Sequence, residues 1–261
     1  MTEVVIVRDA EEGGRLAAAR IARLVERTPR AVLGLATGST PLSTWAALAE
    51  RRLDLSRVRG FALDEYVGLP AGHPESYRAV IDREVVRPLG LDPALVRVPG
   101  DDVAEHGGDW AGAGERYEEA IAAAGGVDLQ VLGIGRTGHI GFNEPGSSLA
   151  SRTRVKTLTD QTRRDNARFF ASADEVPRHC LTQGLGTILR ARELVLLAWG
   201  EGKAEAVAGA VEGPVSSSLP GSAIQLHPEV TVIVDEAAAS RLAHADYYRS
   251  AWENRPDWAR D

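Results

Sequence analysis

The chain has 261 residues, of which 44% are hydrophobic and 26% are charged, and its formal net charge is -7 at pH 7. This composition is typical of a globular protein with a sizeable core and excludes a wholly disordered chain. The acidic balance argues against a nucleic-acid or anionic-membrane binder, which would carry a basic face. The one cysteine, Cys180, excludes an internal disulfide and a cysteine-cluster metal site, and it fits a reducing cytoplasm.

Short apolar runs alternate along the chain with stretches of helical periodicity. The predicted elements are, in chain order, a strand at 4–7, a helix at 11–28, a strand at 31–36, a helix at 42–51, and strands at 60–63, 128–135, 193–200 and 231–235. The strands are continuously apolar, which is typical of parallel strands covered on both faces. Strands separated by helices indicate one doubly wound α/β domain over 1–261, with a mostly parallel sheet and helices on both faces. No secretory signal and no apolar run of about 20 residues is visible.

The segment 145–187 interrupts this rhythm because it has no strong apolar strand. It is basic instead, and its cations are Arg152, Arg154, Lys156, Arg163, Arg164 and Arg168. Such an insertion in an α/β fold is often a mobile lid or an interface element, and a solvated helical excursion is the alternative. The polar, proline-broken tail at 249–261 is predicted to be a surface appendage.

Two loops at predicted strand ends have the features of an anion site. Ligands of open α/β sheets bind beyond the carboxyl ends of the strands. The first loop presents small residues and hydroxyls at a helix N-terminus, which can bind phosphate; its candidates are Thr37, Gly38, Ser39 and Thr40. An ordinary hydroxyl cap of the helix is the alternative. In the other loop Lys203 follows two glycines and can either reach an anion or point to solvent.

Two further loops carry candidate acid–base groups. Asp64 and Glu65 follow the strand at 60–63, where a carboxylate can serve as a general base. Adjacent side chains diverge, so at most one is expected to face the cleft; capping of the following turn is the alternative role. The loop 133–145 is rich in glycine, and its Glu144 can orient the imidazole of His139. No second histidine or cysteine lies at ligand spacing there, so we expect no metal site.

Several longer stretches closely resemble the glucosamine-6-phosphate deaminase family, among the glucosamine/galactosamine-6-phosphate isomerases. They are DEYVGLP at 64–70, HPESY at 73–77, GHIGFNEP at 138–145, SLASRTRVKTLT at 148–159, ATGSTP at 36–41 and LHP at 226–228. The resemblance implies a Rossmann-like fold of the sugar-phosphate isomerase and CoA-transferase type. It also implies conversion of glucosamine 6-phosphate and water to fructose 6-phosphate and ammonia, in amino-sugar catabolism, without a cofactor or metal.

The resemblance also implies roles for individual residues. Asp64 corresponds to the base that moves a proton from C2 to C1, and His139, supported by Glu144, to the group that opens the pyranose ring. The phosphate would be bound by Thr37, Gly38, Ser39 and Thr40, with Arg168 and Lys203 as cationic partners. Thr137 departs from the family, whose bacterial enzymes carry Asp there and some relatives Asn. We expect Glu144 to be the one carboxylate that tunes His139.

In this family the insertion contains a lid, and allosteric members bind N-acetylglucosamine 6-phosphate between subunits of a hexamer. The positions used for that effector correspond to Ser147, Ser148, Arg154 and Lys156. The effector site also draws on subunit termini, and the tail of this chain is divergent, so allosteric control stays open. The resemblance implies a cytoplasmic homo-oligomer, with a hexamer as one candidate, whose partner is a small sugar phosphate rather than nucleic acid or membrane.

Three other functions compete with this interpretation. A 6-phosphogluconolactonase-like hydrolase has a similar sheet but needs no base at C2, so the features at 64–66 and 143–145 argue against it. A non-catalytic sugar-phosphate sensor would explain Thr137, but Asp64, His139 and Glu144 are all retained. A generic α/β binding module would leave the clustering of loops unexplained.

Overall fold

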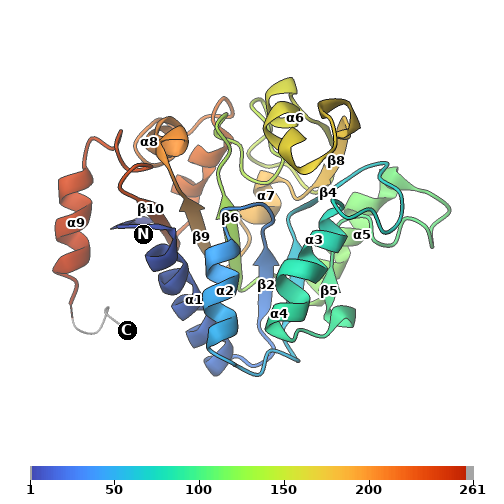
Figure 1. The fold of residues 1–261 in the computed structure, drawn as a ribbon, viewed down its shortest axis with the longest axis horizontal. Coiled ribbons are helices and arrows are strands. Elements are labelled where there is room, and N and C mark those ends of the chain that lie inside the picture. Colours follow the sequence, from blue (N-terminus) through green and yellow to red (C-terminus); the bar gives the residue numbers. More distant parts are fainter. Residues whose placement is uncertain (1, 257–261) are drawn as a thin grey trace.

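The computed structural model describes residues 2–256, and its main element is a seven-stranded sheet (Figure 1). The strand order is β1-β10-β9-β6-β2-β3-β5, and all neighbouring strands pair in parallel. The strands are β1 (Thr2–Val7), β2 (Val32–Leu35), β3 (Arg59–Ala62), β5 (Val96–Arg97), β6 (Leu129–Gly133), β9 (Glu193–Ala198) and β10 (Val230–Asp235). The predicted doubly wound α/β fold is therefore confirmed, and β5 is the one strand of this sheet that the sequence analysis missed.

Helices follow most of these strands. They are α1 (Ala10–Arg27), α2 (Leu42–Glu50), α3 (Tyr77–Ile81), α4 (Arg87–Leu89), α5 (Trp110–Ala123), α6 (Asp160–Asn166), α7 (Leu185–Ile188), α8 (Ala204–Val211) and α9 (Ala245–Glu253). Helix α1 begins at Asp9, whose carboxylate accepts the backbone N–H of Glu12, and it buries Ala17, Ile21 and Val25 at helical spacing. Figure 1 shows α1 and α2 packed side by side in front of the sheet.

The core is built from aliphatic side chains, as the low aromatic content predicts. Strands β9 and β10 are apolar on both faces, and Leu194 and Val232 are fully buried. Two aromatic residues, Trp45 and Tyr117, are nevertheless the largest fully buried side chains. Burial on both sides explains why these strands appear in the sequence as uninterrupted apolar runs.

The order of the strands creates a crevice between β2 and β6. From β2 the chain proceeds to β3 and β5 on one side, whereas β9 and β10 follow β6 on the other side. The loops that leave β2 and β6 therefore diverge, which opens a binding crevice at the carboxyl ends of these two strands.

A small antiparallel sheet stands beside this crevice. Its strands are β4 (Asp64–Tyr66), β8 (His179–Thr182) and β7 (Arg154–Thr157), in that order. The segment 145–187, in which the sequence shows no strong apolar strand, thus contributes two short strands to this sheet. Strands β7 and β8 have four residues each, and β7 alternates between half-buried and exposed positions, so neither forms a long apolar run.

One buried carboxylate ties the segment 145–187 to the main domain. Glu118 of α5 accepts hydrogen bonds from the backbone N–H and hydroxyl of Thr153, at 2.8 and 2.6 Å, and from the hydroxyl of Thr187. The Nε of Arg152 donates to the same carboxylate at 2.8 Å. In Figure 1, helix α6 of this segment lies above the carboxyl end of β2.

The C-terminal part of the described chain is the helix α9 beside the edge strand β1 (Figure 1). It has no fully buried residue, and Ala245, Tyr248 and Trp252 pack partly against the core. The predicted tail thus begins within a surface helix, and residues 257–261 lie outside the described range. Between residues 2 and 256, no helix is long and apolar enough to cross a bilayer.

Candidate active site

A cavity of about 500 Å³ lies at the carboxyl ends of the parallel strands and is lined by all four predicted loops. Its lining includes eight predicted site residues: Thr37, Gly38, Ser39, Thr40, Asp64, His139, Arg168 and Lys203. The lining also includes residues that the sequence analysis did not propose, among them Arg136, Thr162 and Asp165. Loops up to about 160 positions apart in the sequence are thus brought together by the sheet.

The turn after β2 leads directly into α2 at the edge of the cavity. Gly38 has a φ of 85°, a left-handed conformation that favours glycine. The indole Nε1 of Trp199 donates to the carbonyl of Thr40 at 2.8 Å and fixes the turn from the β9 side. Helix α2 has no side-chain cap, so the alternative that this turn only caps the helix is wrong. Backbone N–H groups at a helix N-terminus form a favourable environment for an anion.

Three of the cationic side chains that line the cavity, Arg136, Arg168 and Lys203, lie close enough together to influence one another. The ammonium of Lys203 donates to the carbonyl of Ile134 at 2.7 Å, so Lys203 does not simply point to solvent. Burial lowers the pKa of Lys203, with smaller contributions from the charges of Arg136 and Arg168, while Asp165 opposes them. The guanidinium of Arg168 lies 4.7 Å from the ring centroid of Phe169. An anion placed among these cations would relieve their mutual repulsion.

Asp64 and Glu65 point in different directions and have different partners. The carboxylate of Glu65 accepts the backbone N–H groups of Tyr66 at 2.7 Å and of Tyr77 and Arg78 at 2.8 Å each. It therefore serves the N-terminus of α3, whereas Asp64 lines the cavity. The prediction that at most one of the pair faces the cleft is confirmed. Glu65 does cap, but what it caps is the helix that begins 12 positions later at Tyr77, not the turn that directly follows it.

The carboxyl group of Asp64 is largely kept from water. Burial raises its pKa to about 8, the charge of Glu65 adds to the rise, and the backbone N–H of Phe142 opposes it. Only 6% of the residue is exposed. Desolvation makes a carboxylate a stronger base, which suits proton abstraction from carbon.

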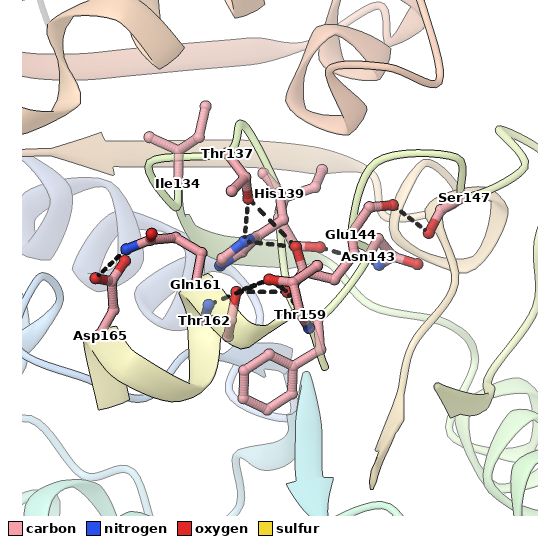
Figure 2. Close-up of polar contacts among 12 residues, drawn as sticks. Ile134, Thr137, His139, Asn143, Glu144, Ser147, Thr159, Gln161, Thr162 and Asp165 are labelled. Carbon is pink, nitrogen blue, oxygen red and sulfur yellow. Dashed lines mark hydrogen bonds and ion pairs between the residues drawn. The ribbon is translucent and has the colours of Figure 1, made fainter. Parts of the chain in front are cut away.

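His139 lies against the glycine-rich loop after β6, with one ring nitrogen in a polar network (Figure 2). A Cβ atom at Gly135 would fall 2.1 Å from the imidazole Cε1, so only glycine leaves room for the ring. The Nδ1 of His139 lies 2.8 Å from the hydroxyl of Thr137 and 3.4 Å from Oε2 of Glu144. The hydroxyl of Thr137 in turn donates to that same carboxylate oxygen at 3.3 Å.

This network favours a proton on Nδ1 of His139. Because the Thr137 hydroxyl donates its single proton to Glu144, its oxygen accepts from Nδ1–H of His139. In the neutral ring, Nε2 then has the free lone pair and is the nitrogen available as a base. Thr137 and Glu144 do not line the cavity; they contact His139 at Nδ1 and can act on the substrate only through its ring.

Glu144 is buried but held in its charged form. Burial alone would raise its pKa, but His139 and the hydroxyls of Thr162 and Thr159 outweigh that effect and lower the pKa to about 2. Its other oxygen, Oε1, accepts the hydroxyl of Thr159 at 3.0 Å and that of Thr162 (Figure 2). Glu144 is therefore an anion at any pH at which the protein would work.

The four residues matched to an effector site lie outside the cavity lining. The hydroxyl of Ser147 donates to the backbone carbonyl of Glu144 at 2.7 Å, and Nη1 of Arg154 donates to Oδ1 of Asn143 at 2.8 Å. Ser148 is exposed, and Lys156 offers its carbonyl to the thiol of Cys180. Two of the four thus contact the stretch that carries Glu144, and their role as an effector site stays a prediction.

Sequence reasoning missed functional candidates in two places. Arg136 lies within the glycine-rich loop, three positions before His139, and its charge among glycines was the available signal. Thr162 belongs to the basic segment, where a hydroxyl carries no signal of its own. In the described range, 2–256, no group of three or more His, Cys, Asp or Glu residues could hold a metal ion.

Known proteins are similar to this chain along nearly all of its length. The family model described as glucosamine-6-phosphate isomerases/6-phosphogluconolactonase matches residues 9–233. The glucosamine-6-phosphate deaminase of Bifidobacterium longum (strain NCC 2705) is 59% identical to this chain, over 99% of each. That of Streptomyces avermitilis is 61% identical over 98% of each.

Solved structures also match this chain over more than nine tenths of its length. A monomeric glucosamine-6-phosphate deaminase superposes with a TM-score of 0.85 at 41% identity, covering 92% of this chain and 99% of that one. The 6-phosphogluconolactonase from Trypanosoma cruzi superposes with a TM-score of 0.73 at 21% identity, covering 93% and 97%. The second similarity shows a shared fold alone.

Proposed function

The chain belongs to the family of glucosamine-6-phosphate isomerases and 6-phosphogluconolactonases, and we propose from this that its cavity converts glucosamine 6-phosphate and water to fructose 6-phosphate and ammonia. The observation that carries the proposal is that Asp64, His139, the 37–40 turn and the cations Arg168 and Lys203 line one cavity. No cofactor is needed, because the reaction moves protons and adds water without net oxidation.

The phosphate binds at the N-terminus of α2. Its oxygens accept from the backbone of the 37–40 turn and from Lys203 and Arg168, in charge-assisted hydrogen bonds. The sugar then extends toward the loop after β6 and toward Asp64. Binding energy at the phosphate thus places the reacting carbons against the acid–base groups.

Ring opening is the first chemical step. The Nε2 of His139 takes the proton from the anomeric hydroxyl, and the imidazolium then gives that proton to the ring oxygen, which gives the open-chain aldehyde. The imidazolium formed in passing is stabilised by the fixed charge of Glu144, reached directly and through the Thr137 hydroxyl.

Isomerisation and deamination follow. The carboxylate of Asp64 removes the proton from C2 while the aldehyde oxygen takes a proton from the substrate's ammonium group, which gives an enediol-type intermediate with the amine on C2. Asp64 then returns its proton to C1. The resulting C2 imine is attacked by water, the C–N bond breaks, and ammonia leaves behind a ketone at C2. The last step is the hydrolytic part of an otherwise isomerase-like reaction.

The direct test is incubation with glucosamine 6-phosphate, with ammonia and fructose 6-phosphate both assayed. Equal amounts of the two products are expected, and 6-phosphogluconolactone should not be hydrolysed at a comparable rate. Because the lactonase needs no base at C2, the buried Asp64 favours the deaminase over this alternative. Absence of ammonia at high enzyme concentration would refute the proposal, and binding without turnover would indicate a sensor.

Arg136 is proposed to be a third cation for the phosphate. Replacing Arg136 by alanine should raise KM for glucosamine 6-phosphate on the order of threefold to tenfold, with little change in kcat, because an exposed charge contributes modestly. Steady-state kinetics at low and high salt measure the effect, which should shrink as salt rises. Arg136→Lys keeps the charge and should recover most of the affinity. A change in kcat with KM unaltered would contradict this role.

Thr137 is proposed to keep the ring-opening group at a single negative charge. Thr137→Asp adds a second carboxylate beside Nδ1 of His139, which favours the protonated ring, so the acid-side limb of the kcat profile should move to higher pH. The profile is measured by ammonia release. If neither kcat nor this limb moves, position 137 is not electrically coupled to ring opening.

The remaining predictions of the sequence analysis are also proposals. The segment 145–187 is proposed to act as a lid within a single α/β domain, and the protein to work in the cytoplasm in amino-sugar catabolism. A homo-oligomer, including a hexamer, is tested by light scattering in solution. Sigmoidal kinetics relieved by N-acetylglucosamine 6-phosphate would assign Ser147, Ser148, Arg154 and Lys156 to an effector site.

A further inference from the structure

The carboxylate of Glu144 is shared between two separate parts of the molecule (Figure 2). Its Oε2 faces the loop after β6, where it meets His139 and the hydroxyl of Thr137. Its Oε1 faces α6, where it accepts hydrogen bonds from the hydroxyls of Thr159 and Thr162. Glu144 and Thr162 are each only 3% exposed, so water does not compete for these contacts. The two oxygens therefore join the ring-opening loop to the segment above the cavity.

The same short segment carries a phosphate cation. Thr159 is the N-cap of α6, and its oxygen accepts the backbone N–H of Thr162 at 3.1 Å. The turn of 3-10 helix that continues α6 places Arg168 in the cavity. The amide of Asn166, at the end of α6, donates to the hydroxyl of Tyr66 at 2.9 Å. A displacement of α6 would thus move both Arg168 and the hydroxyls that hold Glu144.

We propose that Thr159 and Thr162 are positioning residues for ring opening, through which the seating of α6 sets the orientation of Glu144 and hence of His139. The proposal rests on the proposed function of the cavity. Substrate phosphate bound by Arg168 holds α6 in place, and the two hydroxyls transmit that placement to the group that opens the ring. Phosphate binding is thereby coupled to chemistry at the opposite end of the sugar.

The charge of Glu144 gives this coupling a measurable signature. Burial would raise the pKa of Glu144, but His139 and two hydroxyl donors lower it to about 2. Loss of one hydroxyl removes part of that lowering effect, so the pKa of Glu144 should rise. The other titratable group that bears on Glu144 is Cys180 of β8, whose pKa is raised by burial and then by the charges of Asp64 and Glu144. From the described part of α6, the contacts to Glu144 are hydroxyls and one backbone N–H rather than charges.

The kinetic test compares Thr162→Val with Thr162→Ser. Valine matches threonine in shape but has no hydroxyl, so kcat should fall about tenfold, with a smaller change in KM and a larger loss at lower pH. Serine keeps the donor and should restore most of kcat. The matched control is Thr157→Val, an exposed position of β7, which should behave as wild type. A loss equal at every pH, or one that serine does not restore, would overturn the proposal.

A second measurement does not depend on activity. The carboxyl carbon of Glu144, labelled with carbon-13 and assigned by its disappearance in Glu144→Gln, is titrated by NMR in the full chain. In the wild type it should show no titration above about pH 4, and in Thr162→Val its midpoint should rise into that range. An unchanged titration would overturn the proposal. If the wild type releases no ammonia, the proposed function fails, and this titration still decides whether the hydroxyls control Glu144.

Discussion

Asp64→Asn should lower kcat for ammonia release about a hundredfold to ten-thousandfold, while KM changes little. The amide has nearly the shape of the carboxylate but cannot accept the proton from C2, so substrate binds and enolisation stops. Steady-state kinetics with glucosamine 6-phosphate measure both parameters. A variant that keeps more than about a tenth of wild-type kcat would show that another group is the base.

The same variant should be more stable than the wild type at alkaline pH. The pKa of Asp64 is raised in the folded state, to about 8, above its unfolded value near 3.9. Its contribution to folding is therefore fully present below about pH 4 and is lost as pH rises through about 8. Asparagine carries no such penalty, so the stability difference should grow across this window by on the order of 1.4 kcal/mol for each unit of pKa shift. Urea unfolding at several pH values measures it.

Glu65 provides a matched control for Asp64. It is the adjacent carboxylate and is also buried, but it accepts three backbone N–H groups and does not line the cavity. Glu65→Gln should therefore lower the free energy of unfolding by about 1–3 kcal/mol and leave kcat within a few-fold of wild type. If the two variants exchanged these effects, the assignment of base and cap would be reversed.

His139→Gln should lower kcat for the pyranose about a hundredfold or more, because no base remains to take the anomeric proton. A residual rate should persist, since the sugar also opens spontaneously in solution and the open chain still meets Asp64. With enough variant enzyme, the rate of ammonia release should therefore stop rising with enzyme concentration, because uncatalysed opening becomes limiting. Ammonia release at increasing concentrations of the variant measures this limit.

The control for this prediction is His106→Gln, an exposed histidine that does not line the cavity. It should match the wild type at every enzyme concentration. If the rate for His139→Gln stayed proportional to enzyme concentration throughout, His139 would act in enolisation or in binding rather than in ring opening.

The parallel sheet could be predicted because its strands are buried on both faces. Burial of that kind leaves runs such as 193–198 that can be seen in the sequence without knowledge of their partners. The strands that were missed depend on distant partners instead. Strands β4 and β5 have three and two residues, and β7 and β8 have four each, so their existence is decided by pairing with other chain segments, for β4 and β8 more than a hundred positions apart.

The residues of the site could be predicted where they directly follow the strands of the parallel sheet. Parallel strands bring their carboxyl ends together, and so Asp64, His139 and Lys203 were grouped correctly in one cavity. The partners of these residues could not be predicted in the same way. Glu65 caps a helix that begins 12 positions later, and Thr162 reaches Glu144 across 18 positions, both through tertiary packing that has no local pattern.

Asp64 is proposed to move a proton between C2 and C1 on one face of a bound, phosphorylated amino sugar. The most direct test converts glucosamine 6-phosphate deuterated at C2 in heavy water and examines the fructose 6-phosphate by NMR. A single base on one face should deliver deuterium to only one of the two stereochemical positions at C1, with ammonia released in equal amount. Deuterium spread over both positions, or no fructose 6-phosphate at all, would contradict this role of Asp64.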